Sequence, residues 1–420
     1  MRSIALLISF LCSLNFSFTQ VEEGRRITKE LCSERYFGRG YVKGGDSLAA
    51  EFLAAEFERH GIKPIGDSYF QAFKFDVNTF PGKMTLELDS VTLIPGKDFM
   101  VDPASGPSKL TWNYKYLSKE DLFSEKVMAE FLYQLRSTRD WNSLVIDTRG
   151  ITGDSLKEVK GFQKGLAQAC HVISVTDEKF TFSVSQQQLK HAFIHVKGRA
   201  FEKGAAIKSE IEAVVKKQHE ARNVIAKLPA KRRTKNTLML TAHYDHLGAM
   251  GSETYFPGGN DNASGTSMLY ALADIFKKKR LKYNVVFVAF AGEEAGLIGS
   301  KYFVENSPIS LRRIRFLLNI DIMGSGEDGI TVVNGSLHKK QFDRLKKINK
   351  RKQYLSKIRI RGKAANSDHY WFSEKGVPAF FIYTHGPNKH YHDVFDTYEA
   401  LSFAKYNDLV KLTSEFLLNF

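Results

Sequence analysis

The sequence is poor in cysteine and has no apolar run long enough to cross a membrane. Only three cysteines occur in 420 residues, and one of them lies within the first 19 residues. The remaining pair, Cys32 and Cys170, allows at most one disulfide bond, so the chain is not a disulfide-stabilised scaffold. The apolar stretch at residues 4–16 is shorter than the roughly 20 residues of a transmembrane helix, and no later segment reaches that length. We therefore predict no transmembrane segment and no cysteine-rich metal site.

The chain also lacks internal repeats, low-complexity tracts and nucleic-acid-binding motifs. Its net charge of +15 includes lysine and arginine clusters at residues 231–233, 277–280 and 346–352. A basic protein can favour acidic surfaces or peptides. Because no nucleic-acid motif accompanies these clusters, we interpret them as solvated loops and helix ends and predict no nucleic-acid partner.

The first 19 residues have the pattern of a secretory signal peptide. A charged start, Met1-Arg2-Ser3, precedes the short apolar run, and small or polar residues follow it up to Thr19. We predict cleavage near Thr19 and export to the periplasm or the extracellular medium.

The length and the pattern of the chain predict two domains. From residue 223 onward, strands and helices alternate, which predicts an α/β fold with a mixed, largely parallel sheet flanked by helices. The strands are expected at residues 224–227, 238–242, 285–290, 316–320, 331–334 and 379–383, and the helices at 264–279, 297–306, 337–348, 367–375 and 397–417. Residues 82–217 contain short alternating runs and predict a small β-rich domain inserted between residues 20–81 and 218–420.

Polar residues that can bind metals follow the predicted strands of the second part. His243 comes directly after the buried strand 238–242, and Asp321 comes directly after the strand 316–320. Glu293 and Glu294 follow the strand 285–290, and Asp261 precedes a helix. His392 lies in the loop after the strand 379–383. Because the carboxyl ends of parallel strands meet at one edge of a sheet, these side chains are expected to converge.

Two imidazoles and several carboxylates are ligands that suit zinc, and less selectively manganese or cobalt. Asp261, Glu294 and Asp321 offer three negative charges against the four positive charges of two divalent ions. A bridging hydroxide would bring such a site near neutrality. Glu293 is then left over as a general base. Adjacent strand residues point to opposite faces, so the Glu pair must lie in a loop or bulge, which the flanking Gly292 and Gly296 permit.

These motifs resemble the co-catalytic two-zinc aminopeptidase family of exported bacterial enzymes. The likeness covers residues 223–420 and, at the N-terminus, residues 25–73. Residues 82–217 resemble, more weakly, the protease-associated domain often inserted in these enzymes. The motifs are His243-Tyr244-Asp245, Asn260-Asp261-Asn262-Ala263-Ser264-Gly265, Gly292-Glu293-Glu294-Ala295-Gly296, Asn319-Ile320-Asp321-Ile322-Met323-Gly324, and Tyr391-His392 with Asp396-Thr397.

The resemblance implies two Zn²⁺ ions per chain, with Co²⁺ or Mn²⁺ as substitutes. One ion would be bound by His243 and Asp321, and the other by Glu294 and His392. Asp261 would bridge them, and the peptide bond between Asp261 and Asn262 would be strained and cis.

The resemblance also assigns three roles beside the metal ligands. Asp245 would orient the His243 ring through its other nitrogen. Glu293 would take a proton from the bridging water and pass it to the leaving amine. Tyr391 would stabilise the oxyanion.

Four other histidines of this part are expected not to bind metal: His246, His369, His385 and His390. His392 is preferred as the ligand because it forms the family pattern His-x-x-x-Asp-Thr with Asp396 and Thr397, and His390 is the alternative. Asp396-Thr397 is expected to cap the last helix. Ser367-Asp368-His369 is expected to form a polar helix start near the pocket.

These observations predict a metallo-aminopeptidase that acts on peptides with a free N-terminus. Two related activities remain open, a glutaminyl cyclase with one zinc ion and a carboxypeptidase. A non-enzymatic binding module is the alternative from another class. The inserted domain is expected to act as a lid or a docking surface.

Overall fold

The computed structural model describes residues 20–137 and 140–420. The expected signal peptide at residues 1–19 lies outside the described residues. None of the helices in the described ranges is long and apolar enough to cross a membrane.

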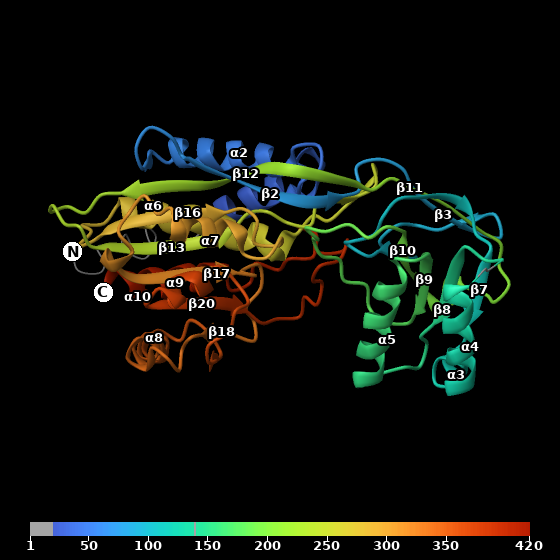
Figure 1. Cartoon of the computed structure of the whole chain (residues 1–420). Coiled ribbons are helices and arrows are strands. Elements are labelled where there is room, and N and C mark those ends of the chain that lie inside the picture. The colour runs from blue at the N-terminus through green and yellow to red at the C-terminus, as the bar shows by residue number, and fades with distance from the viewer. Residues whose placement is uncertain (1–19, 138–139) are drawn as a thin grey trace.

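A nine-stranded mixed sheet forms the centre of the larger part of the molecule (Figure 1). Its strands follow the order β1-β12-β16-β13-β17-β20-β18-β19, and β2 pairs with β12. The four central strands β16, β13, β17 and β20 are parallel. The strands are β1 (Lys63–Pro64), β2 (Phe70–Thr79), β12 (Val214–Leu228), β13 (Thr237–His243), β16 (Asn284–Phe290), β17 (Ile314–Asp321), β18 (Ile330–Val333), β19 (Ile358–Ile360) and β20 (Ala379–Thr384).

The central strands are apolar on both faces because helices cover both sides of the sheet. In β16, Val285 and Phe287 belong to one hydrophobic core and Val286 and Val288 to the other. The first core contains α2 (Gly45–Arg59), α6 (Gly265–Lys277), α8 (Lys339–Lys352), α10 (Tyr406–Leu418) and a helix over residues 20–31. The second core contains α7 (Ile298–Glu305) and α9 (His369–Glu374). The predicted α/β architecture is confirmed. Successive side chains of a strand point to opposite faces of the sheet, so each central strand packs against a layer of helices on both faces.

Residues between β2 and β12 form two further sheets with their own hydrophobic cores. One sheet has the order β5-β10-β9-β8-β7 and the other β4-β3-β11-β6. The strands are β3 (Met84–Leu88), β4 (Val91–Thr92), β5 (Phe99–Val101), β6 (Ser108–Thr111), β7 (Tyr114–Leu117), β8 (Ser143–Asp147), β9 (His171–Thr176), β10 (Phe193–Lys197) and β11 (Ile207–Ile211). Among the described residues, three α-helices and one short 3₁₀ helix accompany them: α3 (Lys119–Leu122), α4 (Glu125–Arg136), α5 (Gly153–Leu166) and η2 (Gly198–Ala200). We call this part the insert, and its two sheets agree with the predicted β-rich insertion.

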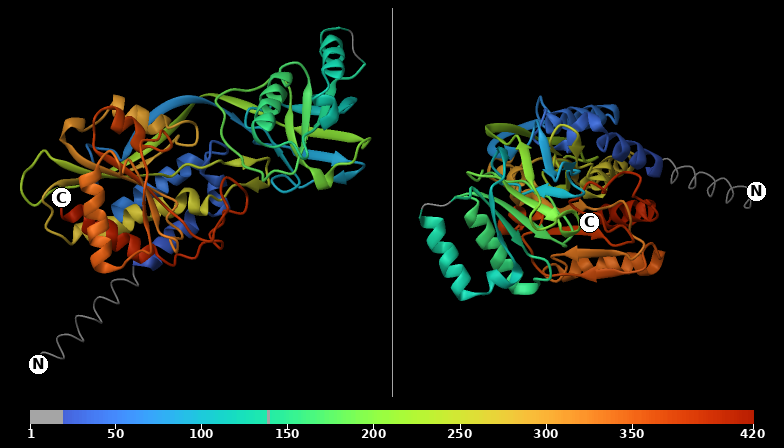
Figure 2. Two further views of the ribbon diagram at one scale, coloured as in Figure 1. Left: turned by 90° about the horizontal axis from the view of Figure 1, so that it is seen from below. Right: turned by 90° about the vertical axis from the view of Figure 1, so that its right-hand side faces the viewer.

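A long antiparallel ribbon of β2 and β12 joins the insert to the central sheet. The pairing extends from Phe70 opposite Val224 to Thr79 opposite Val214, with an irregularity between Lys216 and His219. Figures 1 and 2 show the insert extending beyond one end of the central sheet. Apolar residues 247, 250 and 256, which follow β13, belong to the core of the insert. The carboxyl end of β13 therefore faces the insert.

The two cysteines lie in different cores and do not pair with each other. Cys32 is buried in the core of the central sheet, and Cys170 is buried in the insert. Because the two thiols belong to different cores, no disulfide bond joins Cys32 to Cys170.

Candidate metal centre

The ends of three parallel strands and two loops bring the predicted ligands together. His243 is the last residue of β13, and Asp321 is the last residue of β17. Glu294 lies four residues beyond the end of β16. Asp261 lies in the helical turn η3 (Gly259–Ser264) that leads into α6, and His392 lies in the loop after β20. The convergence expected from the parallel strand direction is present.

The five side chains form two groups that share Asp261. His243 Nε2 lies 3.3 Å from Asp261 Oδ1 and 3.4 Å from Asp321 Oδ2. His392 Nε2 lies 3.1 Å from Asp261 Oδ2 and 3.3 Å from Glu294 Oε2. The carboxylate of Asp261 thus offers one oxygen to each imidazole. Each half of this arrangement contains one imidazole nitrogen, one carboxylate of its own and one oxygen of Asp261.

This set of donors fits two divalent cations. Imidazole nitrogens and carboxylate oxygens are the ligands of zinc in hydrolytic sites. The carboxylates of Asp261 and Glu294 are only 5% and 4% exposed, and Asp321 Oδ1 is buried without a hydrogen-bond partner among the described residues. A buried carboxylate oxygen without a partner is unfavourable unless a cation compensates it.

The backbone around Asp261 is fixed by side chains from other elements. The peptide bond between Asp261 and Asn262 is cis, as the family resemblance implies. Asp396 accepts hydrogen bonds from the backbone N–H groups of Asn260 and Asp261 at 3.0 Å. Asn262 Nδ2 donates to the carbonyl of Ile320 at 3.2 Å, next to Asp321. The residue directly after Asp261 is therefore tied to the end of β17.

Asp396 does not cap the last helix, contrary to the sequence-based expectation. The helix α10 begins at Tyr406, nine residues later than expected. The carboxylate of Asp396 is fully buried and binds the two N–H groups beside Asp261 instead. Burial raises the pKa of Asp396 to about 7, although these two hydrogen bonds oppose that rise. A capping pattern in the sequence cannot reveal that a tertiary partner takes the carboxylate.

Asp245 binds the loop that carries the two glutamates. Its fully buried carboxylate accepts hydrogen bonds from the N–H groups of Glu293 and Glu294 at 3.2 and 3.3 Å. The hydroxyl of Tyr41 donates to the same carboxylate at 2.6 Å. His243 Nδ1 lies closer to the backbone carbonyl of Asp245, at 3.1 Å, than to its carboxylate Oδ1, at 3.8 Å. The Asp245 carboxylate thus orients mainly the glutamate loop, and its carbonyl faces the His243 ring.

Glu293 lies among several negative charges. Burial raises the pKa of the Glu293 carboxyl well above its ordinary value, and the charges of Asp368, Glu294 and Asp321 raise it further, while His243 opposes them. A carboxyl group with a raised pKa can accept and return a proton near neutral pH. The left-handed backbone of Gly292, with φ +70°, forms the turn that the adjacent glutamates require.

The two candidate histidine ligands carry raised pKa values. Burial lowers the pKa of His392, but the charge of Glu294 and the hydrogen bond with Asp261 outweigh it and bring the pKa to about 9. The pKa of His243 is raised well above its ordinary value because Glu293, Asp321 and Asp261 outweigh its burial. The pocket therefore has an excess of negative charge, which suits cations.

The profile of peptidase family M28 matches residues 223–417. This part of the chain, which carries all five candidate metal ligands, is similar to that family. We refer to residues 223–417 as the M28 domain.

Curated relatives and solved structures agree with this assignment. Aminopeptidase YwaD of Bacillus subtilis is 33% identical over 138 residues, which cover 31% of this chain and 29% of that protein. The match thus spans less than a third of the relative. A zinc aminopeptidase from Bacillus subtilis has a TM-score of 0.70 at 18% identity, with 95% of both chains covered. An aminopeptidase from Aneurinibacillus sp. strain AM-1 has a TM-score of 0.61 at 21% identity, with 94% of this chain and 93% of that chain covered. At these identities, the solved structures show the shared fold.

Tyr391 lies at the edge of the M28 site. Its ring stacks on the His392 ring, with centroids 3.9 Å apart and 14° between the planes. The residue is 47% exposed. Partial burial, followed by the charges of Asp261 and Glu294, raises the pKa of Tyr391, and the hydroxyl stays protonated.

His246, which the sequence predicts not to bind metal, contacts Glu294, a predicted ligand in the M28 domain. His246 Nδ1 lies 2.8 Å from Glu294 Oε1, and the side chain is fully buried. It belongs to a group with Asp261 and Glu294 that could hold an ion. The sequence does not predict this contact, because the fold of the loop after β13 determines which side chain faces Glu294.

The remaining histidines lie elsewhere. His390, the alternative to His392, has a 44% exposed side chain and lies 3.6 Å from Asp393. His385 Nε2 bonds to Thr331 Oγ1 at 2.7 Å. His369 is buried at the start of α9, as the predicted polar helix start requires.

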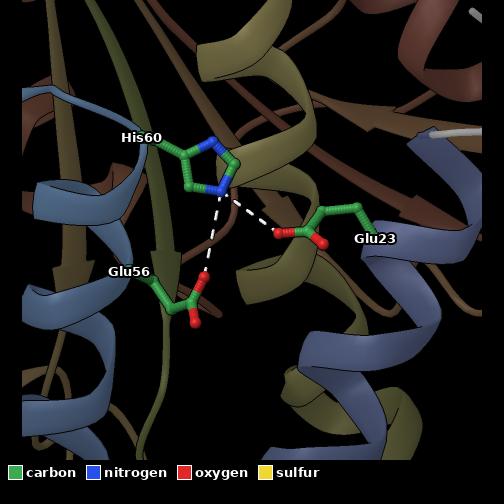
Figure 3. A group of neighbouring side chains, drawn as sticks. All are labelled: Glu23, Glu56 and His60. Atoms are coloured by element: carbon green, nitrogen blue, oxygen red, sulfur yellow. Dashed lines mark hydrogen bonds and ion pairs between the residues drawn. The ribbon is translucent and has the colours of Figure 1, made fainter.

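A second histidine–carboxylate cluster lies in the N-terminal part of the chain and is an ion-pair network (Figure 3). His60 Nε2 lies 3.2 Å from Glu23 Oε1 and 3.8 Å from Glu56 Oε2. Arg26 and Arg59 each form ion pairs with both glutamates. Two guanidinium groups already neutralise the two carboxylates, so this cluster does not need a cation.

Proposed function

We propose that the protein is an exported zinc aminopeptidase that removes the N-terminal residue from peptides with a free amino group. The observation that carries this proposal is the carboxylate of Asp261, which faces His243 with one oxygen and His392 with the other. The match of residues 223–417 to peptidase family M28, and relatives named aminopeptidase and zinc metalloprotease, support the peptidase assignment.

In this proposal the protein binds two zinc ions per chain. His243 and Asp321 would hold one ion, and His392 and Glu294 would hold the other. Asp261 would contact both. Bound zinc polarises the scissile carbonyl and makes water a nucleophile near neutral pH. Cobalt or manganese would substitute because they accept the same donors.

Glu293 moves the proton in this mechanism. Its carboxylate takes a proton from the attacking water as the carbon–oxygen bond forms. It then gives this proton to the leaving amine nitrogen as the carbon–nitrogen bond breaks. The products are a free amino acid and a peptide shortened by one residue. The raised pKa of Glu293 supports both halves of this transfer.

Tyr391 would donate a hydrogen bond to the oxyanion that develops on the scissile carbonyl. Its protonated hydroxyl and its position on the His392 ring support this role.

We further propose that residues 1–19 direct export, and that residues 20–81 and 218–420 form the metallopeptidase domain around a protease-associated-like domain of residues 82–217. The separate sheets and cores of the insert support this division.

The decisive experiment uses the purified mature protein with free and N-blocked peptides, with and without a chelator, and identifies products by mass. Release of single N-terminal residues from free but not from blocked peptides, abolished by the chelator and restored by zinc, is the expected result. Loss of ammonia from N-terminal glutamine would indicate a glutaminyl cyclase instead. Release from the C-terminus would indicate a carboxypeptidase, and no turnover would indicate a binding module.

A further inference from the structure

An extended segment of the insert, residues 181–188, lies against the metal-ligand loops of the M28 domain. It leaves the sheet of the insert after β9 and contains neither helix nor strand. We call it the strap. We propose that the strap is a positioning element of the metal centre and that it acts on His392 through the backbone of Phe182. This inference rests on the proposed function, because it concerns the second of the two zinc sites.

The backbone of Phe182 forms two hydrogen bonds with His392. The N–H of Phe182 donates to the carbonyl of His392 at 2.8 Å. The carbonyl of Phe182 lies 3.0 Å from His392 Nδ1 and can only accept, so Nδ1 carries the proton. The other nitrogen, Nε2, is then the one that can offer its lone pair to a cation, and it faces Asp261 and Glu294. The strap thus selects the tautomer and the ring orientation that a metal ligand needs.

The backbone of His392 adopts a conformation that side chains other than glycine rarely take. Its φ is +53°, in the left-handed region. For a residue other than glycine, this region is unfavourable by about 1 kcal/mol or more, so surrounding contacts must hold it. The pair of hydrogen bonds from Phe182 supplies such contacts on both the backbone and the side chain of His392.

Further contacts fix the strap to the loops on either side of the site. Just before the strap, Lys179 Nζ pairs with Asp393 Oδ2 at 2.7 Å, directly after His392 in the chain. Gln186 Nε2 donates to the carbonyl of Ala295 at 2.9 Å, directly after Glu294. The strap therefore contacts the loops of both ligands of the second site.

The side chain of Phe182 anchors the strap to a third loop. It is 4% exposed and stacks on Phe256, with ring centroids 4.8 Å apart and 5° between the planes. Phe256 belongs to the loop between His243 and Asp261. Substitution of this ring should loosen the strap without removing any predicted ligand.

The test uses the full chain stripped of metal by a chelator, with zinc affinity at each site measured by titration against a competing chelator. Phe182→Leu keeps an apolar side chain but loses the stacking with Phe256. We expect it to weaken the second zinc site by about tenfold or more while the first site is unchanged, as substitutions behind a ligand typically do. Phe180→Leu is the matched control, because Phe180 is similarly buried at 7% and forms no hydrogen bond with His392 among the described contacts. The control should bind zinc like the wild type.

Two further measurements keep the test independent of folding. Gln186→Ala removes an exposed side chain and should weaken the second site several-fold without a change in the unfolding temperature of the metal-free protein. In a His392→Ala background, Phe182→Leu should have no further effect on zinc affinity. Equal affinities for Phe182→Leu and Phe180→Leu, or an unchanged effect in the His392→Ala background, would overturn the proposal and leave the proposed function intact. Wild-type protein that binds no zinc would overturn both.

Discussion

Replacing Glu293 by glutamine separates proton transfer from metal binding. The amide has nearly the same shape as the carboxylate but cannot take a proton from water. Glu293 is not one of the four residues that face Asp261 or its imidazole partners at 3.1–3.4 Å. We therefore expect kcat to fall by about 10²- to 10⁴-fold, the usual contribution of a general base, which corresponds to about 3–5 kcal/mol in the activation barrier.

The same substitution should not destabilise the metal-free protein. Burial and the neighbouring charges of Asp368, Glu294 and Asp321 disfavour the ionised form of Glu293. Glutamine removes this charge and therefore the repulsion. The unfolding temperature of the metal-free Glu293→Gln variant should equal or exceed that of the wild type in a calorimetric scan.

Three measurements on the purified variant test this reasoning: steady-state hydrolysis of an amino-acid amide, zinc content after dialysis, and calorimetry. Glu294→Gln serves as the control, because it should lose zinc as well as activity. Full activity of Glu293→Gln would remove this residue from the mechanism. Loss of one zinc ion would show that Glu293 is a ligand instead of a base.

Three further predictions follow. His392→Ala should lower the zinc content from two ions to one and abolish turnover, whereas His390→Ala should change neither the zinc content nor turnover. Metal analysis of the two variants measures the difference, and the reverse result would make His390 the ligand. A chelator should lower the unfolding temperature at pH 7, since zinc at about 1,000 times its Kd stabilises the folded state by about 4 kcal/mol per site, and an unchanged temperature would argue against resident metal. The pKa of His60 rises from 6.5 to about 9 because its hydrogen bonds with Asp274 and Glu23 outweigh its burial. Protonated His60 should therefore contribute about 3 kcal/mol to the free energy of unfolding, a contribution that is complete below pH 6.5 and disappears as the pH rises through 9. His60→Gln should flatten the dependence of the unfolding free energy on pH in that range. An unchanged slope would contradict this role of His60.

The local pattern of the chain predicted the central elements well. The strands around residues 238–242, 285–290, 316–320 and 379–383 are β13, β16, β17 and β20. These strands are buried on both faces, and such strands appear in a sequence as continuous apolar runs bounded by polar residues. His243 and Asp321 come directly after such apolar runs, and this position indicates a metal site at the edge of the sheet.

Predictions that depended on tertiary partners were less reliable. The last helix begins at Tyr406 because Asp396 binds the N–H groups beside Asp261 and does not cap the helix. The contacts of His246 with Glu294 and of Tyr41 with Asp245 join residues 48 and 204 positions apart. A sequence pattern records the chemistry of each of these side chains but not the partner that the fold provides.

The sequence by itself indicated the candidate metal donors, the buried strands that carry them and a change of pattern at residues 82–217, because residue type and apolar periodicity are local properties. Only the tertiary structure decided how the donors are held. The strap positions His392 through a backbone carbonyl and a backbone N–H group. Every residue except proline has both groups, so the residue types at 181–188 do not indicate this role. Packing brings residue 182 next to residue 392, although they are far apart in the chain. Only this packing makes the backbone groups of Phe182 partners of His392.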